Sequence, residues 1–225
     1  KKVGCCGFRN KYIMKIMIEE QVQLAPFTTM RVGGDARFFT RVKNIDELAE
    51  AIIFASENSL PFFVIGGGSN TLVSGNGFSG LVIKIELKGN SYEGDKVTAG
   101  AGEMWDDVVQ NIVSRNLWGV ENLSLIPGTV GGAVAQNIGA YGMEARETIF
   151  SVEAFDIEKM KIKIFSRDEC EFGYRESIFK KNKNLIVTRV TFALEQNGTP
   201  RTDYEDVIKY FETNKKSFLV LSSIF

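Results

Sequence analysis

Two glycine-rich segments constrain the fold of this chain more than any other part of its sequence. The first, "GGGSN" at residues 66–70, lies between the apolar runs "PFFVI" and "GLVIKI". The second, "LIPGTVGGAVAQNIGAYG" at 125–142, is too apolar for a solvated loop and too rich in glycine for a core helix. Glycine loses the most conformational entropy on folding, so such runs indicate a backbone that bends unusually or approaches another group closely.

Around these segments the chain mixes helical and strand-like patterns. Residues 44–59 place Leu48, Ile52 and Ala55 on one face, which predicts an amphipathic helix with Asn44 as its N-cap. This mixture indicates an α+β fold with two lobes. Further helices are predicted at 103–117 and 203–214, strands at 61–67, 80–85, 96–102 and 184–194, and a hairpin at 151–165 with its turn at 157–160.

The composition narrows the chemistry and the partners. The 225 residues are 44% hydrophobic and 24% charged, and the net charge is −1. The chain is therefore not basic overall, and its charge does not indicate nucleic-acid binding. The chain has no histidine, which excludes histidine-based triads and histidine-ligated metals. Its three cysteines show no metal-ligand spacing. We therefore expect no metal, and expect the chemistry to come from other side chains or from a bound cofactor.

The sequence also bears on location. No stretch approaches the roughly 20 apolar residues of a membrane span, so none is predicted. Residues 1–18 are interrupted by Arg9, Lys11 and Lys15 and lack a small-residue cleavage site, so we interpret them as a leader- or tag-like segment. The cysteines give no disulfide framework, which favours a reducing compartment. We expect a cytoplasmic monomer.

The glycine segments are suited to a phosphate-bearing ligand. A glycine loop after a buried strand can bring backbone N–H groups up to a phosphate. Residues 66–70 match neither G-x-G-x-x-G nor the P-loop, however, and a strand follows them, so a tight strand–strand connection is an equal alternative. The segment 125–142 has the character of an ordered stretch that lines a ligand.

With one segment in each lobe, the two would face each other across a cleft. An extended diphosphate cofactor would fit such a cleft, and FAD is the natural candidate for a chain without histidine. At Gly67 we expect a positive φ, and we expect a side chain there to occupy the place of the phosphate.

Several motifs, in order and spacing, resemble the UDP-N-acetylenolpyruvoylglucosamine reductase family. The enzymes of this bacterial family use NADPH and FAD to reduce the enolpyruvyl group of UDP-N-acetylglucosamine enolpyruvate, which gives UDP-N-acetylmuramate for cell-wall peptidoglycan. The resemblance covers residues 20–210. The motifs are "TTMRVGG" (28–34), "VIGGGSNTLVSGNGFSGLVI" (64–83), "AGAG" (99–102), "GVENLSLIPGTVGGAVAQNIGAYG" (119–142) and "CEFGYRESIFK" (170–180).

The resemblance implies a two-lobed FAD-binding domain of the vanillyl-alcohol-oxidase type, followed by only the start of a third domain. We divide the chain into the leader-like segment 1–18, a first FAD-binding lobe at 19–88, a second at 89–197, and a truncated start of the substrate-binding domain at 198–225. Family members carry in the third domain a serine that protonates the intermediate and a glutamate, and neither motif follows here. The closing apolar run, Phe218–Phe225, would be partner-seeking if exposed.

The resemblance also assigns roles to single residues. Arg175 takes the position of the family's catalytic arginine, where a guanidinium would pair with the charge that develops on the substrate; a surface arginine paired with Glu171 or Glu176 is the alternative. Tyr204 takes the position of a substrate-contacting tyrosine, with packing at a helix start as the alternative. The residues expected to bind FAD are Thr29, Arg31, Gly66, Gly67, Gly68, Ser69, Asn70, Ser124, Pro127, Gly128, Gly131, Asn137, Gly139 and Tyr141.

The segment around Arg175 has an alternating pattern of its own. Phe172 and Tyr174 alternate with Gly173 and Arg175. If the segment is extended, both aromatic rings point to one side and Arg175 points to the other.

Three functions are open on the sequence. The first is the reductase, acting on a UDP-sugar. The second is an FAD-binding module without full activity, which the missing C-terminal part favours. The third is a related FAD-dependent oxidase of a small alcohol or sugar. The lack of a histidine for covalent flavin attachment and the segment 125–142 both count against the oxidase.

Overall fold

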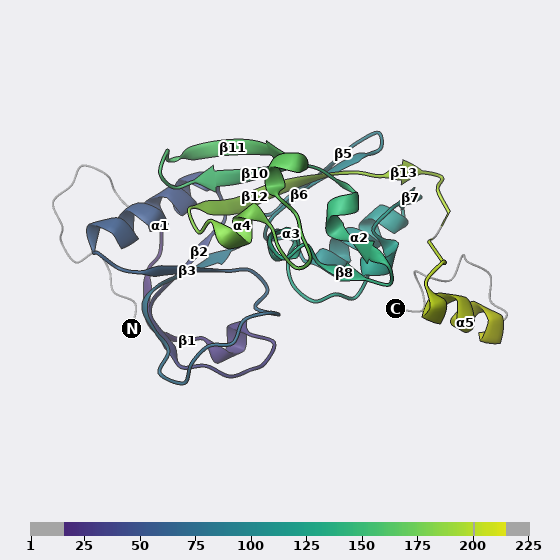
Figure 1. Ribbon diagram of the computed structural model, residues 1–225. Helices are drawn as coiled ribbons and strands as arrows, with labels where there is room; N and C mark the ends of the chain where they lie inside the picture. The colour runs from purple at the N-terminus through teal and green to yellow at the C-terminus, as the bar shows by residue number, and fades with distance from the viewer. Residues whose placement is uncertain (1–15, 200, 215–225) are drawn as a thin grey trace.

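The computed structural model describes residues 16–199 and 201–214, so most of the leader-like segment and the apolar run 218–225 lie outside the described part. Two sheets dominate it (Figure 1). The first has the strand order β1-β2-β4-β3 and the second has the order β11-β10-β12-β6-β5. Their strands are β1 (Glu19–Gln23), β2 (Asp35–Val42), β3 (Phe62–Ile65), β4 (Phe78–Ile85), β5 (Asn90–Glu93), β6 (Lys96–Gly100), β10 (Ile149–Asp156), β11 (Lys161–Ser166) and β12 (Leu185–Ala193).

Helices and short strand pairs complete the fold, and the predicted α+β class is confirmed. The helices are α1 (Ile45–Glu57), α2 (Trp105–Val113), α3 (Val130–Ala135), α4 (Ile178–Lys181) and α5 (Glu205–Asn214), with 3-10 turns η1 (Ala25–Phe27), η2 (Glu121–Leu123), η3 (Ala145–Glu147) and η4 (Asp168–Cys170). The short pairs are β7 (Leu117–Trp118) with β13 (Glu195–Gln196), and β8 (Gly139–Ala140) with β9 (Met143–Glu144).

The first sheet is built around β4. This strand pairs in parallel with both β2 and β3, and β1 adds antiparallel to β2. The register between β2 and β4 shifts between Ala36 and Phe38. This irregularity places Ala36 and Phe39 on the same face although they are an odd number of residues apart. Residues of the two hydrophobic clusters described below cover the two faces of the sheet.

The second sheet is antiparallel throughout. The predicted hairpin at 151–165 is confirmed as β10 and β11, and its turn falls at residues 157–160 as expected. On the other side of β10, β12 pairs with both β10 and β6. The strands of the first sheet lie within residues 19–85 and those of the second within 90–193. The domain boundaries drawn from the sequence stay a prediction.

The predicted helix at 44–59 forms as α1. The side chain of Asn44 accepts a hydrogen bond from the backbone N–H of Glu47 at 2.9 Å, so it is the N-cap. Leu48, Ala51, Ile52 and Ala55 form its buried face. The helix predicted at 103–117 is shorter in the structure: α2 runs from Trp105 to Val113, and the strand β7 begins at Leu117.

One part of the second glycine segment differs from its prediction. Residues 130–135 form the helix α3, where we expected irregular backbone only. Val130, Ala133 and Val134 stand at helical spacing and are buried, while Gly131 packs so closely that a Cβ there would lie 2.9 Å from the Cβ of Ala101. The glycines of this stretch permit close packing of a short helix and do not prevent helix formation.

A continuous hydrophobic core joins the two sheets. It contains residues of α1 and β4 on one side, such as Leu48 and Ile83, and of β6, β10 and β12 on the other, such as Val97 and Phe192. Trp105, at the start of α2, is 1% exposed, and its indole N–H donates to the carbonyl of Leu123 at 2.7 Å. A smaller cluster, which includes Phe39 and Ile65, covers the other face of the first sheet.

At the C-terminal end, α5 lies apart from both sheets, and β13 and an extended segment lead to it (Figure 1). Lys209 and Glu205 form an ion pair that lies within the helix itself. Among the described residues, no helix is long and apolar enough to cross a membrane.

Trp105→Phe should lower the free energy of unfolding by about 2 kcal/mol or more, because it leaves the buried carbonyl of Leu123 without a donor and opens a cavity. Urea unfolding followed by circular dichroism measures this loss. The matched control is Trp118→Phe at the half-buried strand β7, which should cost clearly less. Equal losses in the two variants would contradict the role given to Trp105.

Candidate functional site

The two glycine segments are in direct contact. A Cβ on Gly67 would lie 2.6 Å from the Cα of Gly128, and a Cβ on Gly66 would overlap the side-chain hydroxyl of Thr129. Likewise, a Cβ on Gly128 would lie 2.8 Å from the hydroxyl of Ser69. The sequence led us to expect that the two segments face each other across a cleft. The structure shows instead that they meet at this point.

A third backbone segment closes the contact from the N-terminal side. The N–H of Thr29 donates to the carbonyl of Gly68 at 3.2 Å, and a Cβ on Gly68 would overlap the carbonyl of Phe27. Gly68 has a φ of 68°, whereas Gly67 is not among the residues with positive φ. The positive φ expected at Gly67 is wrong: a glycine is required here because the backbone at Gly128 leaves no room for a side chain.

Arg31 and Asn70 lie at the rim of this contact. Arg31 is exposed, and its left-handed backbone (φ 53°) turns the chain so that its N–H donates to the carbonyl of Thr28 at 3.2 Å. Asn70 is exposed at the end of the first glycine segment. The structure thus brings the predicted residues Thr29, Arg31, 66–70 and Gly128 together at one place.

This meeting point carries a set of unused backbone donors. None of the N–H groups of residues 66–70 donates a hydrogen bond to another residue in the described ranges, and the same holds for the N–H groups of Gly128 and Thr129. Buried backbone N–H groups in folded proteins, such as that of Gly68, are nearly always paired. Consecutive free donors around a residue with positive φ form a concavity that binds anions.

Thr129 contributes a side-chain donor that the sequence did not single out. Its side chain is 3% exposed, and its hydroxyl is the buried side-chain polar atom without a hydrogen-bond partner among the described residues. It lies beside Gly66. In the sequence, Thr129 has the pattern of an ordinary N-cap residue before α3, yet it makes no side-chain cap. The missing cap bond leaves this hydroxyl available to a ligand.

Lys84 approaches the same loop from β4. Its ammonium donates to the carbonyl of Gly66 at 2.6 Å. Partial burial lowers the pKa of Lys84 from its ordinary value; Glu86 offsets this lowering in part, and Lys88 and Arg41 add to it. No local pattern in the sequence indicates this residue, because a lysine within a strand pattern is typical of a solvated position.

The remaining predicted residues at the start of the second segment have structural partners. Ser124 donates its hydroxyl to a carboxylate oxygen of Asp106 at 2.9 Å, and the same oxygen accepts the N–H of Leu125 at 2.6 Å. Pro127 is exposed, and Gly131 donates its N–H to the carbonyl of Ala101 at 2.9 Å. These contacts fix the path of the chain into Gly128. Direct binding of FAD by these residues stays a prediction.

Asn137 is buried and fully hydrogen-bonded. Its amide N–H₂ donates to the carbonyl of Gly173 at 2.8 Å and to Glu144 at 3.2 Å, and its oxygen accepts the N–H of Arg146 at 3.0 Å. Ser177 adds a second link, donating its hydroxyl to the carbonyl of Ala135 at 2.7 Å. The turn that carries Arg175 is therefore fastened to the second glycine segment.

Arg175 itself reaches back to that segment, donating to the carbonyl of Gly139 at 3.2 Å. The alternative of a surface ion pair is not what the structure shows: Glu176 pairs with Lys180 at 3.1 Å, and Glu171 pairs with Lys181 at 3.6 Å. The guanidinium thus lies beside the predicted cofactor segment.

The alternation expected around Arg175 is wrong. Gly173 and Glu176 exchange backbone hydrogen bonds across a tight turn, and Arg175 has a φ of 55°. Because a turn has no two-residue side-chain period, Phe172 packs on the core while Tyr174 is 85% exposed.

Tyr141 and Tyr204, predicted to contact cofactor and substrate respectively, lie against each other. Their rings meet edge to face with centroids 5.7 Å apart. The segment before Tyr204 is held by buried groups of η2. Glu121 accepts the N–H of Arg201 at 3.1 Å, and the amide of Asn122 donates to the carbonyls of Arg201 and Tyr141 at 3.0 and 3.2 Å.

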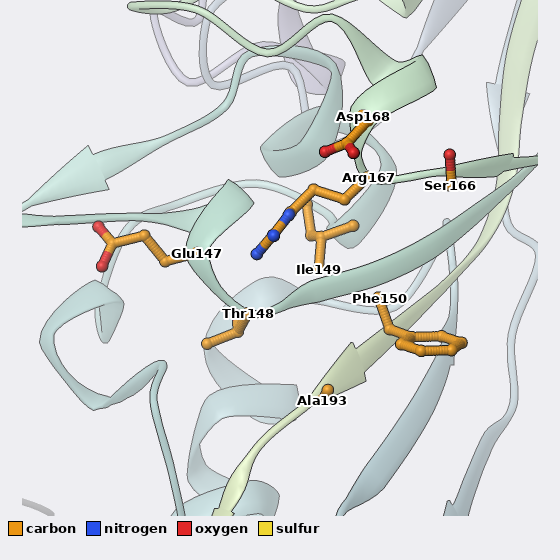
Figure 2. A pocket seen from close by; sticks show the side chains of 8 residues that line it. All are labelled: Glu147, Thr148, Ile149, Phe150, Ser166, Arg167, Asp168 and Ala193. Carbon is orange, nitrogen blue, oxygen red and sulfur yellow. The ribbon is translucent and has the colours of Figure 1, made fainter.

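Two surface cavities lie elsewhere. One, of about 310 Å³, is lined by residues 147–150, 166–168 and Ala193, and Figure 2 shows the side chain of Arg167 extending into it. The other, of about 460 Å³, is lined by residues of β1, β2 and the loop before β4. Neither is lined by a residue predicted to bind FAD. Within the described part of the chain no group of acidic or cysteine side chains is arranged to hold a metal ion.

Comparison with known proteins agrees with this geometry. The family described as an FAD binding domain matches residues 36–160, more than half of the chain, so the fold and the site define an FAD-binding protein. The solved structure of UDP-N-acetylenolpyruvylglucosamine reductase from Thermus caldophilus superposes with a TM-score of 0.70 at 30% identity, covering 88% of this chain and 68% of that one. This chain belongs to the UDP-N-acetylenolpyruvoylglucosamine reductase family.

Two other likenesses show the extent of the match. The reductase of Pseudomonas syringae pv. tomato is 39% identical over 200 residues, which are 86% of this chain and 59% of that protein. The chain therefore spans about three fifths of the length of the curated relatives that it matches. Physcomitrella patens BBE-like 1 shares the fold alone, with a TM-score of 0.62 at 14% identity. The predicted FAD-binding fold class is confirmed.

Gly67→Ala should abolish FAD retention, because even a methyl group at this position would push the first glycine segment away from Gly128 and separate the two sets of donors. Equilibrium dialysis of the purified chain against FAD measures retention. Gly75→Ala is the control, since a Cβ there has nothing within 4 Å and the backbone is not left-handed. Unchanged retention in Gly67→Ala would show that the contact with Gly128 is not needed.

Proposed function

We propose that the junction of the two glycine segments binds the diphosphate of FAD. The unused N–H groups of residues 66–70 carry this proposal, because they lie beside the unpartnered hydroxyl of Thr129. A diphosphate would accept these hydrogen bonds and give partners to donors that have none among the described residues. The residues present fit the cofactor that the family match implies.

We propose further that the chain is the FAD-binding part of an NADPH-dependent enzyme that reduces the enolpyruvyl group of UDP-N-acetylglucosamine enolpyruvate to give UDP-N-acetylmuramate for peptidoglycan. The membership in the reductase family supports this. Bound FAD supplies a two-electron carrier between NADPH and the enolpyruvyl carbon.

Arg175 is the proposed catalytic residue. Its guanidinium lies at Gly139, in the segment that adjoins the diphosphate site, and neither neighbouring carboxylate neutralises it. Addition of a hydride to an enolpyruvyl double bond shifts negative charge toward the carboxylate. A fixed guanidinium pairs with that charge by two parallel hydrogen bonds, and so stabilises the transition state more than the substrate.

The UDP-sugar is proposed to bind beside the aromatic pair. Tyr204 is 40% exposed and is held against Tyr141 through the bonds of Glu121 and Asn122 to residue 201. An exposed tyrosine at a fixed position offers both a flat apolar surface and a hydroxyl to a nucleotide-sugar.

The two rival functions differ in what they require. An FAD-binding module without full activity would use the same diphosphate site, and Arg175 would then have no catalytic role. An FAD-dependent oxidase would share the fold, as Physcomitrella patens BBE-like 1 does, but the 39% identity to a reductase favours the reductase.

Thr129→Val should weaken FAD binding about tenfold, since it removes one hydroxyl from an anion site while keeping the shape of the side chain. Flavin fluorescence titration of the purified, initially FAD-free chain measures the Kd. Thr98→Val is the control, because its hydroxyl bonds to Thr191 on the second sheet at 2.9 Å. A wild-type chain that stays colourless in excess FAD would overturn the cofactor assignment.

In a protein that carries the complete third domain, Arg175→Ala should leave FAD affinity unchanged and slow the reoxidation of the NADPH-reduced flavin by the UDP-sugar enolpyruvate about 10²- to 10³-fold. Anaerobic stopped-flow absorbance of bound flavin measures this rate, with Arg167→Ala as the control on a different surface. Reoxidation at the wild-type rate in Arg175→Ala would refute the catalytic role. A wild-type chain that binds FAD but is never reoxidised would favour the FAD-binding module.

A further inference from the structure

Lys84, in strand β4, lies beside the point where β3 ends and the first glycine segment begins. It is in register with Ile65, the last residue of β3, and β3 and β4 run parallel. The loop 66–70 therefore leaves the carboxyl end of β3 directly beside the Lys84 side chain. Ligands of parallel sheets bind at the carboxyl ends of the strands.

The contact of Lys84 orients one of the proposed donors. Its ammonium donates to the carbonyl of Gly66 at 2.6 Å. That carbonyl and the N–H of Gly67 belong to one planar trans peptide, so they point in opposite directions. With its carbonyl held toward Lys84, this peptide presents the Gly67 N–H on the opposite side of the loop. The bond from Thr29 to the carbonyl of Gly68 fixes the Ser69 N–H in the same way.

The charge of Lys84 is favoured by the carboxylate of Glu86, which it shares with a second cation. Among the described residues, Lys84 takes part in no ion pair, and the carboxylate of Glu86 is engaged by Arg41 at 3.6 Å. The other charges that act on Lys84 are the cations Lys88 and Arg41. A half-buried ammonium that takes part in no ion pair costs free energy that a nearby bound anion would offset.

We propose that Lys84 is a positioning residue of the diphosphate site: it fixes the Gly66–Gly67 peptide so that its N–H faces the ligand, and it supplies the positive charge that balances the diphosphate. This inference rests on the proposed binding of FAD at the loop. It assigns to Lys84 a preference for the phosphate part of the cofactor. A lysine that only braced the loop would affect every ligand of the site alike.

The test compares two probes that share the isoalloxazine ring, FAD and riboflavin, which lacks both phosphates. Their Kd values are measured by flavin fluorescence on the wild-type chain and on Lys84→Met, Lys84→Arg and Lys88→Met. Lys84→Met removes the charge and the bond but keeps the length of the side chain. Lys88→Met removes the same charge from an exposed lysine that pairs with Glu103 at 3.2 Å and does not touch the loop.

We expect Lys84→Met to weaken FAD about tenfold and riboflavin less than twofold, in line with the loss of one charge-assisted hydrogen bond. Lys84→Arg should retain most of the FAD affinity, and Lys88→Met should change it less than twofold. Equal weakening of FAD and riboflavin in Lys84→Met, or no weakening of FAD, would overturn the proposal. If Lys84→Met does not fold, the Lys84→Arg chain provides the test. A folded Lys84→Arg chain whose affinities for FAD and for riboflavin fall by the same factor overturns the proposal.

Failure of this inference is distinguishable from failure of the proposed function. A wild-type chain that binds FAD, with Lys84→Met binding it equally well, leaves the cofactor site intact and removes Lys84 from it. A wild-type chain that binds no FAD overturns both.

Discussion

The site depends on one constraint: three backbone segments meet with no room for a side chain between them. Residues 27–29, 66–69 and 127–129 approach so closely that a Cβ on Gly67 or Gly68 would collide with main-chain atoms. The carbonyls of Gly66 and Gly68 face inward to Lys84 and Thr29. The N–H groups of Gly67 and Ser69, which belong to the same two peptides, point the opposite way and have no partner among the described residues, so the close packing of the glycines also presents the donors of the proposed diphosphate site.

A second set of contacts ties this junction to the proposed catalytic turn. Asn137 is used entirely within the protein, linking the second glycine segment to Gly173 and Arg146. The segment that adjoins the proposed diphosphate site therefore also positions Arg175. Conversely, Tyr141 near the end of the same segment contacts Tyr204, so one stretch of 18 residues, 125–142, connects the regions proposed for cofactor, reacting group and substrate.

Patterns that are local in the sequence predicted the structure well. The spacing of Leu48, Ile52 and Ala55 gave α1, and the turn at 157–160 gave the β10–β11 hairpin. Strand β2 was not predicted, because it is covered on both faces and its irregular register breaks the two-residue alternation. Helix α3 was not predicted, because the adjacent glycines Gly131 and Gly132 disfavour a helix. Glycine content located the two glycine segments and motif resemblance singled out Arg175. Thr129 and Lys84, in contrast, are noticed only through their contacts with residues distant in the sequence, which no local pattern contains.

The continuous core between the two sheets has a consequence for how the molecule can move. Because side chains of α1, β4, β6 and β12 share one buried cluster, the sheets cannot rock apart as rigid bodies without exposing it. Opening for an extended ligand would therefore have to come from loops such as residues 66–70, which contribute nothing to that cluster, whereas the second glycine segment is held in it by Val130, Val134 and Ile138. The same shared core makes the two sheets a single cooperative unit, so neither is expected to persist when the other unfolds.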